Sequence, residues 1–138
     1  MLFPLMKILC IDDESGVLLF LNAALSKEHE VTTACCGEEG LTAFRNEGPF
    51  PIVITDIQMP DMSGFDVVNQ VKFEIPSTVC MLITGQADFN YSSDAVEEGK
   101  AEKCLLKPLV LKDLRKAVQE CVDLANERTQ SSYMILAK

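Results

Sequence analysis

The chain has 138 residues, a length that fits one domain with a single core. Hydrophobic residues make up 48% of it and charged residues 24%, which is typical of a folded globular protein and not of a disordered one. The formal net charge of -9 disfavours direct binding to nucleic acid or to anionic membranes, and no apolar run approaches the roughly 20 residues that span a bilayer.

The first half of the chain alternates between two kinds of apolar pattern. Residues 7–11 (KILCI) form a short, nearly continuous apolar run, which is typical of a strand buried on both faces of a parallel sheet. Apolar residues then recur at the spacing of one helix face over residues 17–25. A weaker strand pattern at residues 31–35 and a short helical one at residues 41–44 follow.

The same alternation continues in the middle of the chain. Residues 51–55 (PIVIT) and 78–84 (TVCMLIT) are two further buried-strand runs. Between them, a helical stripe covers residues 67–75, and Pro76 ends it because the residue before a proline avoids the helical conformation.

The last third gives two weak signals and one strong one. Residues 95–96 indicate a fourth helix and residues 104–106 a fifth strand, while a long apolar stripe over residues 111–125 predicts the final helix. The stripe does not continue after that point. We therefore expect one domain over residues 1–126, followed at residues 127–138 by a C-terminal tail or the start of a linker.

Five strands that alternate with five helices predict an α/β fold. Right-handed crossovers between parallel strands place helices on both faces of the sheet. We therefore expect a single doubly wound, five-stranded parallel sheet of the flavodoxin-like class, with strand order 2-1-3-4-5.

The six cysteines do not indicate a metal site. Cys10 and Cys80 lie within buried-strand runs, Cys35 and Cys36 are adjacent, and the sequence has no C-x-x-C pair. We expect them to be reduced and to act as small hydrophobic residues, in a cytoplasmic protein.

Polar side chains follow four of the five predicted strands. They are Asp12, Asp13 and Glu14 after the first strand, Thr55 and Asp56 after the third, Thr84 and Gly85 after the fourth, and Lys107 and Pro108 after the fifth. Each alone is common in a turn, because Asp and Thr cap helices. Together they meet at the edge where open α/β sheets bind ligands.

This combination permits a narrow chemistry. A hard divalent cation relieves the repulsion between clustered carboxylates, and Mg²⁺ keeps water and phosphate among its ligands. A carboxylate can attack phosphorus to give an aspartyl phosphate, with a lysine and a hydroxyl neutralising the charge. The single histidine, His29, is expected in a turn at the surface and not at this edge.

These residues, with the D-x-x-M-P-x-x-x-G stretch from Asp56 to Gly64, resemble the receiver domain of response regulators in two-component systems, the CheY-like family. The resemblance covers about residues 7–126. It implies a signalling phosphoprotein of a phosphorelay that assists its own phosphorylation and dephosphorylation and is not an enzyme. The donor would be a sensor histidine kinase or a histidine phosphotransfer protein. The output would be a downstream protein target or a fused output domain, and a phosphorylation-dependent homodimer is a further expectation.

The resemblance also implies a role for each site residue. Asp56 would accept the phosphoryl group, and Mg²⁺ would be bound by Asp13, Asp56 and the backbone carbonyl of Gln58, with Asp12 acting through water. Lys107 would contact the phosphoryl oxygens, next to a cis bond to Pro108. Thr84 would hydrogen-bond the phosphoryl group and move toward it.

Three positions concern switching and tuning. Cys104 stands where the family usually has an aromatic residue that turns inward with the threonine, so the coupling to the output face is expected to be altered, unless Phe89 or Tyr91 substitutes. Gln58 and Gly85 occupy positions that modulate phosphoryl lifetime in the family. An ordinary loop role is an equal alternative for both.

Two other functions remain open. A phosphohydrolase that works through an aspartyl phosphate typically has a second Asp two residues after the nucleophile as general acid/base, and here that residue is Gln58. A module that only binds proteins would not need the complete set of polar residues. The sequence leaves open whether the domain acts alone or belongs to a longer regulator.

Overall fold

The computed structural model describes residues 6–136, and the side chains of residues 6–129. Its strands form one parallel sheet in the predicted order β2-β1-β3-β4-β5. The strands are β1 (Lys7–Ile11), β2 (Glu30–Ala34), β3 (Ile52–Asp56), β4 (Val79–Thr84) and β5 (Lys103–Leu106). The helices are α1 (Ser15–Leu25), α2 (Gly37–Asn46), α3 (Gly64–Glu74), α4 (Phe89–Glu97) and α5 (Leu111–Leu136), with a short 3-10 turn η1 (Gln86–Asp88) before α4. The predicted fold class is therefore confirmed.

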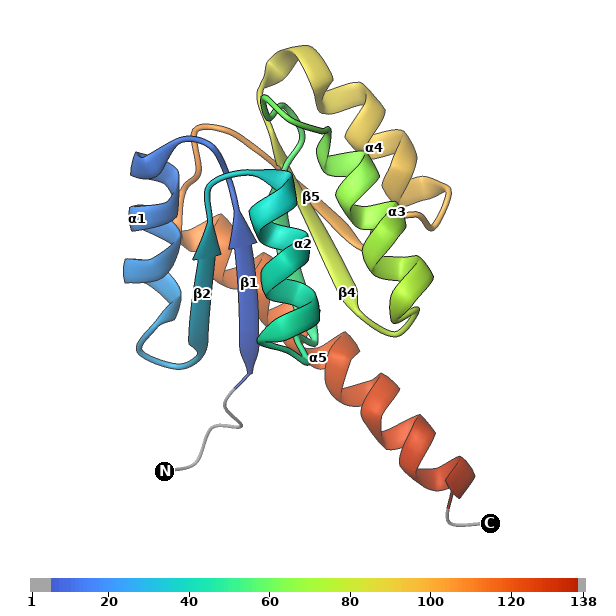
Figure 1. The fold of residues 1–138 in the computed structure, drawn as a ribbon. Helices are drawn as coiled ribbons and strands as arrows, with labels where there is room; N and C mark the ends of the chain where they lie inside the picture. Colours follow the sequence, from blue (N-terminus) through green and yellow to red (C-terminus); the bar gives the residue numbers. More distant parts are fainter. Residues whose placement is uncertain (1–5, 137–138) are drawn as a thin grey trace.

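The helices cover both faces of the sheet (Figure 1). A hydrophobic core lies on each face of the sheet, and alternate residues of β1 point into one or the other. Ile8 and Cys10 pack with α1 and α5, while Leu9 and Ile11 pack with α2, α3 and α4. Strands β3 and β4 are buried along their whole length, which explains their continuous apolar sequences. β2 is an edge strand and is partly exposed, so its sequence signal is weaker.

Helix α5 is longer than the helix that was predicted from the apolar stripe over residues 111–125. It passes the expected boundary at residue 126 without a break, and its far end extends beyond the body of the domain (Figure 1). The stripe ends because Ala125 is the last residue of the helix in the buried core of the described side chains. Beyond it, Arg128 donates to the backbone carbonyl of Ser77 and to Glu102, each at 3.1 Å. The division into a domain at residues 1–126 and a tail stays a prediction.

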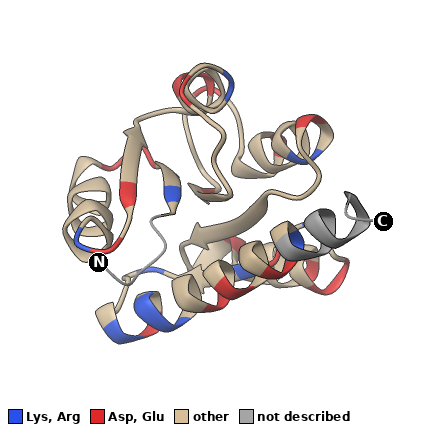
Figure 2. Ribbon diagram, turned by 90° about the horizontal axis from the view of Figure 1, so that it is seen from below, with Lys and Arg blue, Asp and Glu red and all other residues tan. Residues whose placement is uncertain are grey.

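Acidic and basic residues both lie along α5, and this helix is on the side of the sheet opposite α2 and α3 (Figure 2). No helix in the described part of the chain combines the length and the apolar composition that crossing a membrane requires.

Candidate functional site

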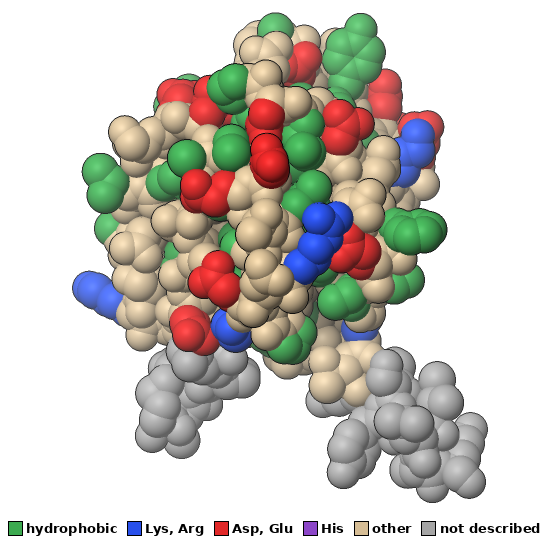
Figure 3. Space-filling model, in the orientation of Figure 1, with side chains coloured by type: hydrophobic (Ala, Val, Ile, Leu, Met, Phe, Trp, Pro, Cys, Tyr) green, Lys and Arg blue, Asp and Glu red, His purple; other side chains and the backbone are tan. Residues whose placement is uncertain are grey.

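Four carboxylates converge at the edge where the parallel strands end. One carboxylate oxygen from each of Asp12, Asp13, Glu14 and Asp56 lies within 4.8 Å of the others. β1 and β3 pair with Ile11 beside Thr55, and this register places Asp12 next to Asp56. Asp12 and Asp56 are buried, whereas Asp13 and Glu14 are exposed, so the cluster is open to solvent on one side. Figure 3 shows further acidic side chains scattered over the upper part of one face, towards these strand ends.

Lys107 reaches into this cluster from the end of β5. Its Nζ lies 2.9 Å from Asp12 Oδ2, 2.8 Å from Glu14 Oε1 and 3.4 Å from Asp56 Oδ1. The backbone N–H of Lys107 donates to the carbonyl of Thr84 at 2.7 Å, and the bond to Pro108 is cis, as expected. Burial lowers the pKa of Lys107, but hydrogen bonds and charges from the carboxylates outweigh it and raise that pKa overall, so the amine is an ammonium.

Glu14 was placed at the predicted edge with Asp12 and Asp13, but the sequence predicted no role for it in the site. It occupies the N-cap position of α1, where a Ser, Thr, Asp or Asn side chain commonly accepts a hydrogen bond from the helix. Its side chain makes no such cap and instead accepts a hydrogen bond from Lys107. Its place directly after Asp12 and Asp13 is the only signal that could have indicated this.

The electrostatics of the buried carboxylates favour a cation. Burial and then the charge of Asp12 raise the pKa of Asp56 to about 6, against the opposing effects of Lys107 and the N–H of Ile57. Burial also raises the pKa of Asp12. Asp12 Oδ2 is near the Lys107 ammonium but outside hydrogen-bond geometry, so this buried oxygen has no hydrogen-bond partner among the described residues. A set of four carboxylates around a single ammonium could hold a hard divalent cation, because that cation would offset the remaining negative charge.

The loop after β3 holds Asp56 in place. The N–H of Ile57 donates to Asp56 Oδ1 at 2.9 Å, and the N–H of Gly64 donates to the carbonyl of Ile57 at 2.8 Å. A Cβ atom on Gly64 would lie 2.1 Å from the carbonyl oxygen of Asp56, so only glycine allows the loop to fold back this closely. Ser63 and Asp66 form a capping box that starts α3 at this point.

The same loop is attached to the start of α2. The Asp61 carboxylate accepts hydrogen bonds from the backbone N–H groups of Gly37 at 3.0 Å and Glu38 at 2.7 Å. These N–H groups, that of Glu38 foremost, lower the pKa of Asp61. Asp61 thus provides the cap that α2 lacks from Cys36, its own N-cap residue, whose side chain forms no cap hydrogen bond.

The predicted switch residues lie around the end of β4. Thr84 is buried, and its hydroxyl donates to the carbonyl of Gly85 at 3.2 Å. Gly85 is exposed, and a Cβ atom there would meet nothing within 4 Å. Cys104 is half-buried on β5 opposite Leu82 of β4.

Gln58 and Asp13 line a common cavity of about 750 Å³ over the loop after β3. This cavity gives access to the exposed side of the carboxylate cluster. The sole histidine, His29, lies in the turn before β2, as predicted, at the end of the sheet remote from the carboxylate cluster. It is half-buried and lines a small cavity with Leu25 and Val118.

Comparison with known proteins agrees with this geometry. Residues 8–119 match the family described as response regulator receiver domain. The chain is 33% identical over 123 residues to the two-component response regulator ARR10 of Arabidopsis thaliana, which covers 87% of this chain but 22% of that protein. This chain thus spans only a small part of that relative.

Two solved structures share the fold over nearly the whole chain. The crystal structure of a response regulator receiver domain protein from Clostridium thermocellum has a TM-score of 0.76 at 33% identity, covering 95% of this chain and 99% of that one. The crystal structure of adenylate cyclase from Rhodopirellula baltica has a TM-score of 0.92 at 28% identity, covering 98% of this chain and 100% of that one.

Proposed function

Because this chain belongs to the response regulator receiver domain family of two-component systems, we propose that it accepts a phosphoryl group on Asp56 within a phosphorelay. The observation that carries the proposal is the position of the Lys107 ammonium, 3.4 Å from Asp56 Oδ1 within a cluster of carboxylates that is open to solvent. Receiver domains are signalling proteins, and this one would assist its own phosphorylation and dephosphorylation without turning over a separate substrate.

Mg²⁺ is the cofactor we propose for this site. Asp13, Asp56 and the backbone carbonyl of Gln58 would hold it, with Asp12 acting through water. The fit is supported by the oxygen-only donor set and by the buried Asp12 Oδ2 that lacks a hydrogen-bond partner among the described residues. When bound, the ion would neutralise charge that develops on the phosphoryl oxygens.

Asp56 is the nucleophile in the reaction we propose. A bond forms between its carboxylate oxygen and phosphorus while the P–N bond of a phosphohistidine breaks, and the leaving imidazole keeps the electron pair. The attacking carboxylate must be ionised. A pKa raised to about 6 still leaves most of Asp56 ionised at neutral pH.

Lys107 and Thr84 would respond to the new charge. The ammonium contacts three carboxylates before the reaction and would transfer to the phosphoryl oxygens after it. The Thr84 hydroxyl, which donates to its neighbouring carbonyl, would turn to the phosphoryl group and move the end of β4. Cys104 stands opposite Leu82 on the neighbouring strand and cannot follow this movement as a rotating ring does.

A phosphohydrolase is less well supported than a phosphoacceptor. Gln58 lies two residues after Asp56, and an amide cannot act as a general acid/base. We propose a sensor histidine kinase or a histidine phosphotransfer protein as donor, and a protein target or a fused output domain as receiver of the signal. All six cysteines are free, which fits the cytoplasmic location that we propose.

Intact-mass spectrometry after incubation with Mg²⁺ and acetyl phosphate tests the proposal. We expect one added phosphoryl group on the native protein and none on Asp56→Asn. Asp88→Asn is the matched control, since Asp88 is an acidic residue on the same side of the molecule that does not belong to the carboxylate cluster. An equal adduct on Asp56→Asn would refute the assignment. The absence of an adduct with both acetyl phosphate and a panel of phosphorylated histidine kinases would leave a module that only binds proteins.

A further inference from the structure

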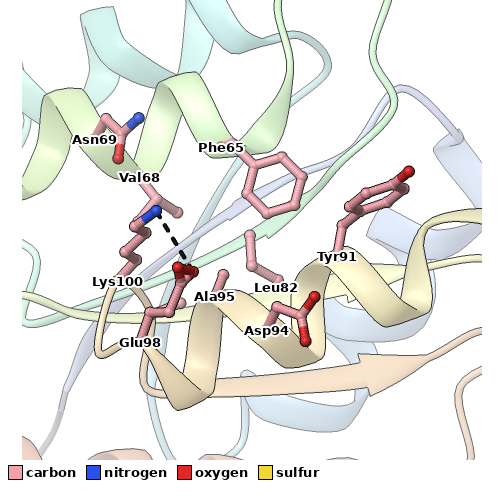
Figure 4. A pocket seen from close by; sticks show the side chains of 10 residues that line it. Phe65, Val68, Asn69, Leu82, Tyr91, Asp94, Ala95, Glu98 and Lys100 are labelled. Atoms are coloured by element: carbon pink, nitrogen blue, oxygen red, sulfur yellow. Dashed lines mark ion pairs between the residues drawn. The ribbon is translucent and has the colours of Figure 1, made fainter.

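Helices α3 and α4 enclose a pocket of about 400 Å³ that does not include any of the four clustered carboxylates (Figure 4). Val68, Leu82, Ala95 and Ala101 are buried residues that line it. Figure 4 shows the ring of Phe65 from α3 and the ring of Tyr91 from α4 next to each other and near Leu82 of β4. The volume is within the range of pockets that bind small ligands or single large side chains.

Tyr91 has no role in the core of the domain. Its side chain is 67% exposed, although it lies at the edge of an apolar pocket. A large exposed aromatic beside a concave apolar surface is the arrangement that binding partners commonly bury. Tyr91 would lose its exposed area against a ligand in this pocket.

The rim of the pocket is acidic. Residues 86–98, which contain α4, have four acidic residues and no basic one. Glu98 pairs with Lys100 at 3.6 Å, and this is the ion pair drawn in Figure 4. Asp94 also lines the pocket and has no ion-pair partner among the described residues. The free charge at the opening is therefore negative.

We propose that the α3–α4 pocket binds a basic amphipathic segment of a partner protein. An aromatic or large aliphatic side chain of the segment enters between Phe65 and Tyr91 and contacts Leu82. A lysine or arginine next to it in the segment pairs with Asp94. The net charge of -9 attracts such a segment, whereas it repels an acidic one.

Two elements connect this pocket to the carboxylate cluster. Leu82 is two residues before Thr84 on β4, and Phe65 directly follows Gly64, whose Cα packs on the backbone of Asp56. A phosphoryl group that moves either element changes the affinity of the pocket for the segment. By linkage, the bound segment then changes the equilibrium constant of phosphorylation by the same factor. This coupling rests on the proposed function, but the binding itself does not.

Binding is tested with a synthetic peptide of leucine and lysine at helical spacing, titrated into the ¹⁵N-labelled, unphosphorylated full chain. We expect saturable shifts of amide signals from α4 and the start of α3, and none with the same peptide carrying glutamate in place of lysine. Asp94→Lys and Tyr91→Ala should each weaken binding about five- to tenfold. Glu97→Lys makes the same charge change on α4 outside the pocket lining and should change the Kd by less than about twofold.

Three results would overturn the proposal: no saturable binding, shifts centred on another surface, or equal weakening by Glu97→Lys and Asp94→Lys, which would indicate diffuse charge attraction. The coupling is measured separately, by repeating the titration after treatment with Mg²⁺ and acetyl phosphate. If peptide binding is intact but neither acetyl phosphate nor the phosphorylated histidine kinases give a phosphoryl adduct on the protein, the proposed function fails and the binding site stands.

Discussion

Glu102 gives the sharpest test of how the tertiary structure holds this domain together. It lies in the loop before β5, and its side chain is 11% exposed. The carboxylate accepts the backbone N–H of Cys80 at 2.7 Å, the ammonium of Lys72 from α3 at 2.6 Å and the guanidinium of Arg128 from α5 at 3.1 Å. It thus joins two helices on opposite faces of the sheet to β4.

The expected cost of Glu102→Ala follows from these partners. The N–H of the fully buried Cys80 would lose its acceptor, which costs about 1–3 kcal/mol. The side chains of Lys72 and Arg128 are 21% and 34% exposed, so water replaces part of the interaction that each loses with Glu102. The loss of these two ion pairs therefore adds about 1 kcal/mol to the cost. We expect a loss of about 3 kcal/mol in the free energy of unfolding. Glu102→Gln can keep the bond to Cys80 and should lose about 1 kcal/mol.

Urea denaturation followed by circular dichroism measures both losses. Glu98→Ala is the matched control, because it removes an exposed ion pair with Lys100 and should cost less than about 0.5 kcal/mol. If Glu102→Ala and Glu98→Ala differ by less than the error of the method, the interactions of Glu102 contribute no stability and the reasoning fails.

The pH dependence supplies a second check on the same residue. Burial raises the pKa of Glu102, but the hydrogen bonds from the N–H of Cys80, from Lys72 and from Arg128, with the charge of Lys72, outweigh it and lower that pKa overall. A lowered pKa gives stability that is present above the unfolded-state value of about 4.3 and is lost as the pH falls through the folded-state value. The difference between native protein and Glu102→Gln should therefore shrink at acidic pH. A difference that stays constant from neutral to acidic pH would contradict this.

Three further predictions concern the surroundings of Asp56. Gly64→Ala should destabilise the fold by about 3 kcal/mol in thermal or urea denaturation and impair phosphorylation, because the new Cβ would lie 2.1 Å from the backbone oxygen of Asp56. In the control Gly85→Ala the new Cβ meets nothing within 4 Å, so stability should change by less than about 0.5 kcal/mol. Equal effects of the two substitutions would refute the packing argument. Asp61→Asn should cost about 1 kcal/mol in the same assay and speed amide exchange at the start of α2, because the α2 cap is weakened; an unchanged exchange rate would count against the cap. Cys104→Tyr should strengthen the coupling, seen as a larger change in amide exchange of α4 on phosphorylation than in the native protein; an unchanged response would reject that role for Cys104.

The sequence was sufficient to predict the fold and the main members of the site. Buried parallel strands need continuous apolar runs, so β1, β3 and β4 were recognisable from residues 7–11, 51–55 and 78–84. Parallel strands also end at a common edge, so polar residues placed after successive strands must come together whatever the details of packing. This is why the convergence of Asp12, Asp56 and Lys107 could be predicted from the sequence alone.

The tertiary structure decided what depends on pairs of residues far apart in the chain. Nothing local to Glu14 indicates a partner for its side chain, yet packing places its Oε1 2.8 Å from Lys107 Nζ. Helix α5 continues past residue 126, where Arg128 donates a hydrogen bond to Glu102. Hydrophobic periodicity does not predict a polar contact of that kind. The pocket between α3 and α4 exists because Phe65 of α3 and Tyr91 of α4, which are far apart in the chain, line a common space beside Leu82 of β4. Local propensity and periodicity describe each element by itself, whereas these features arise only from the way the elements are placed against one another.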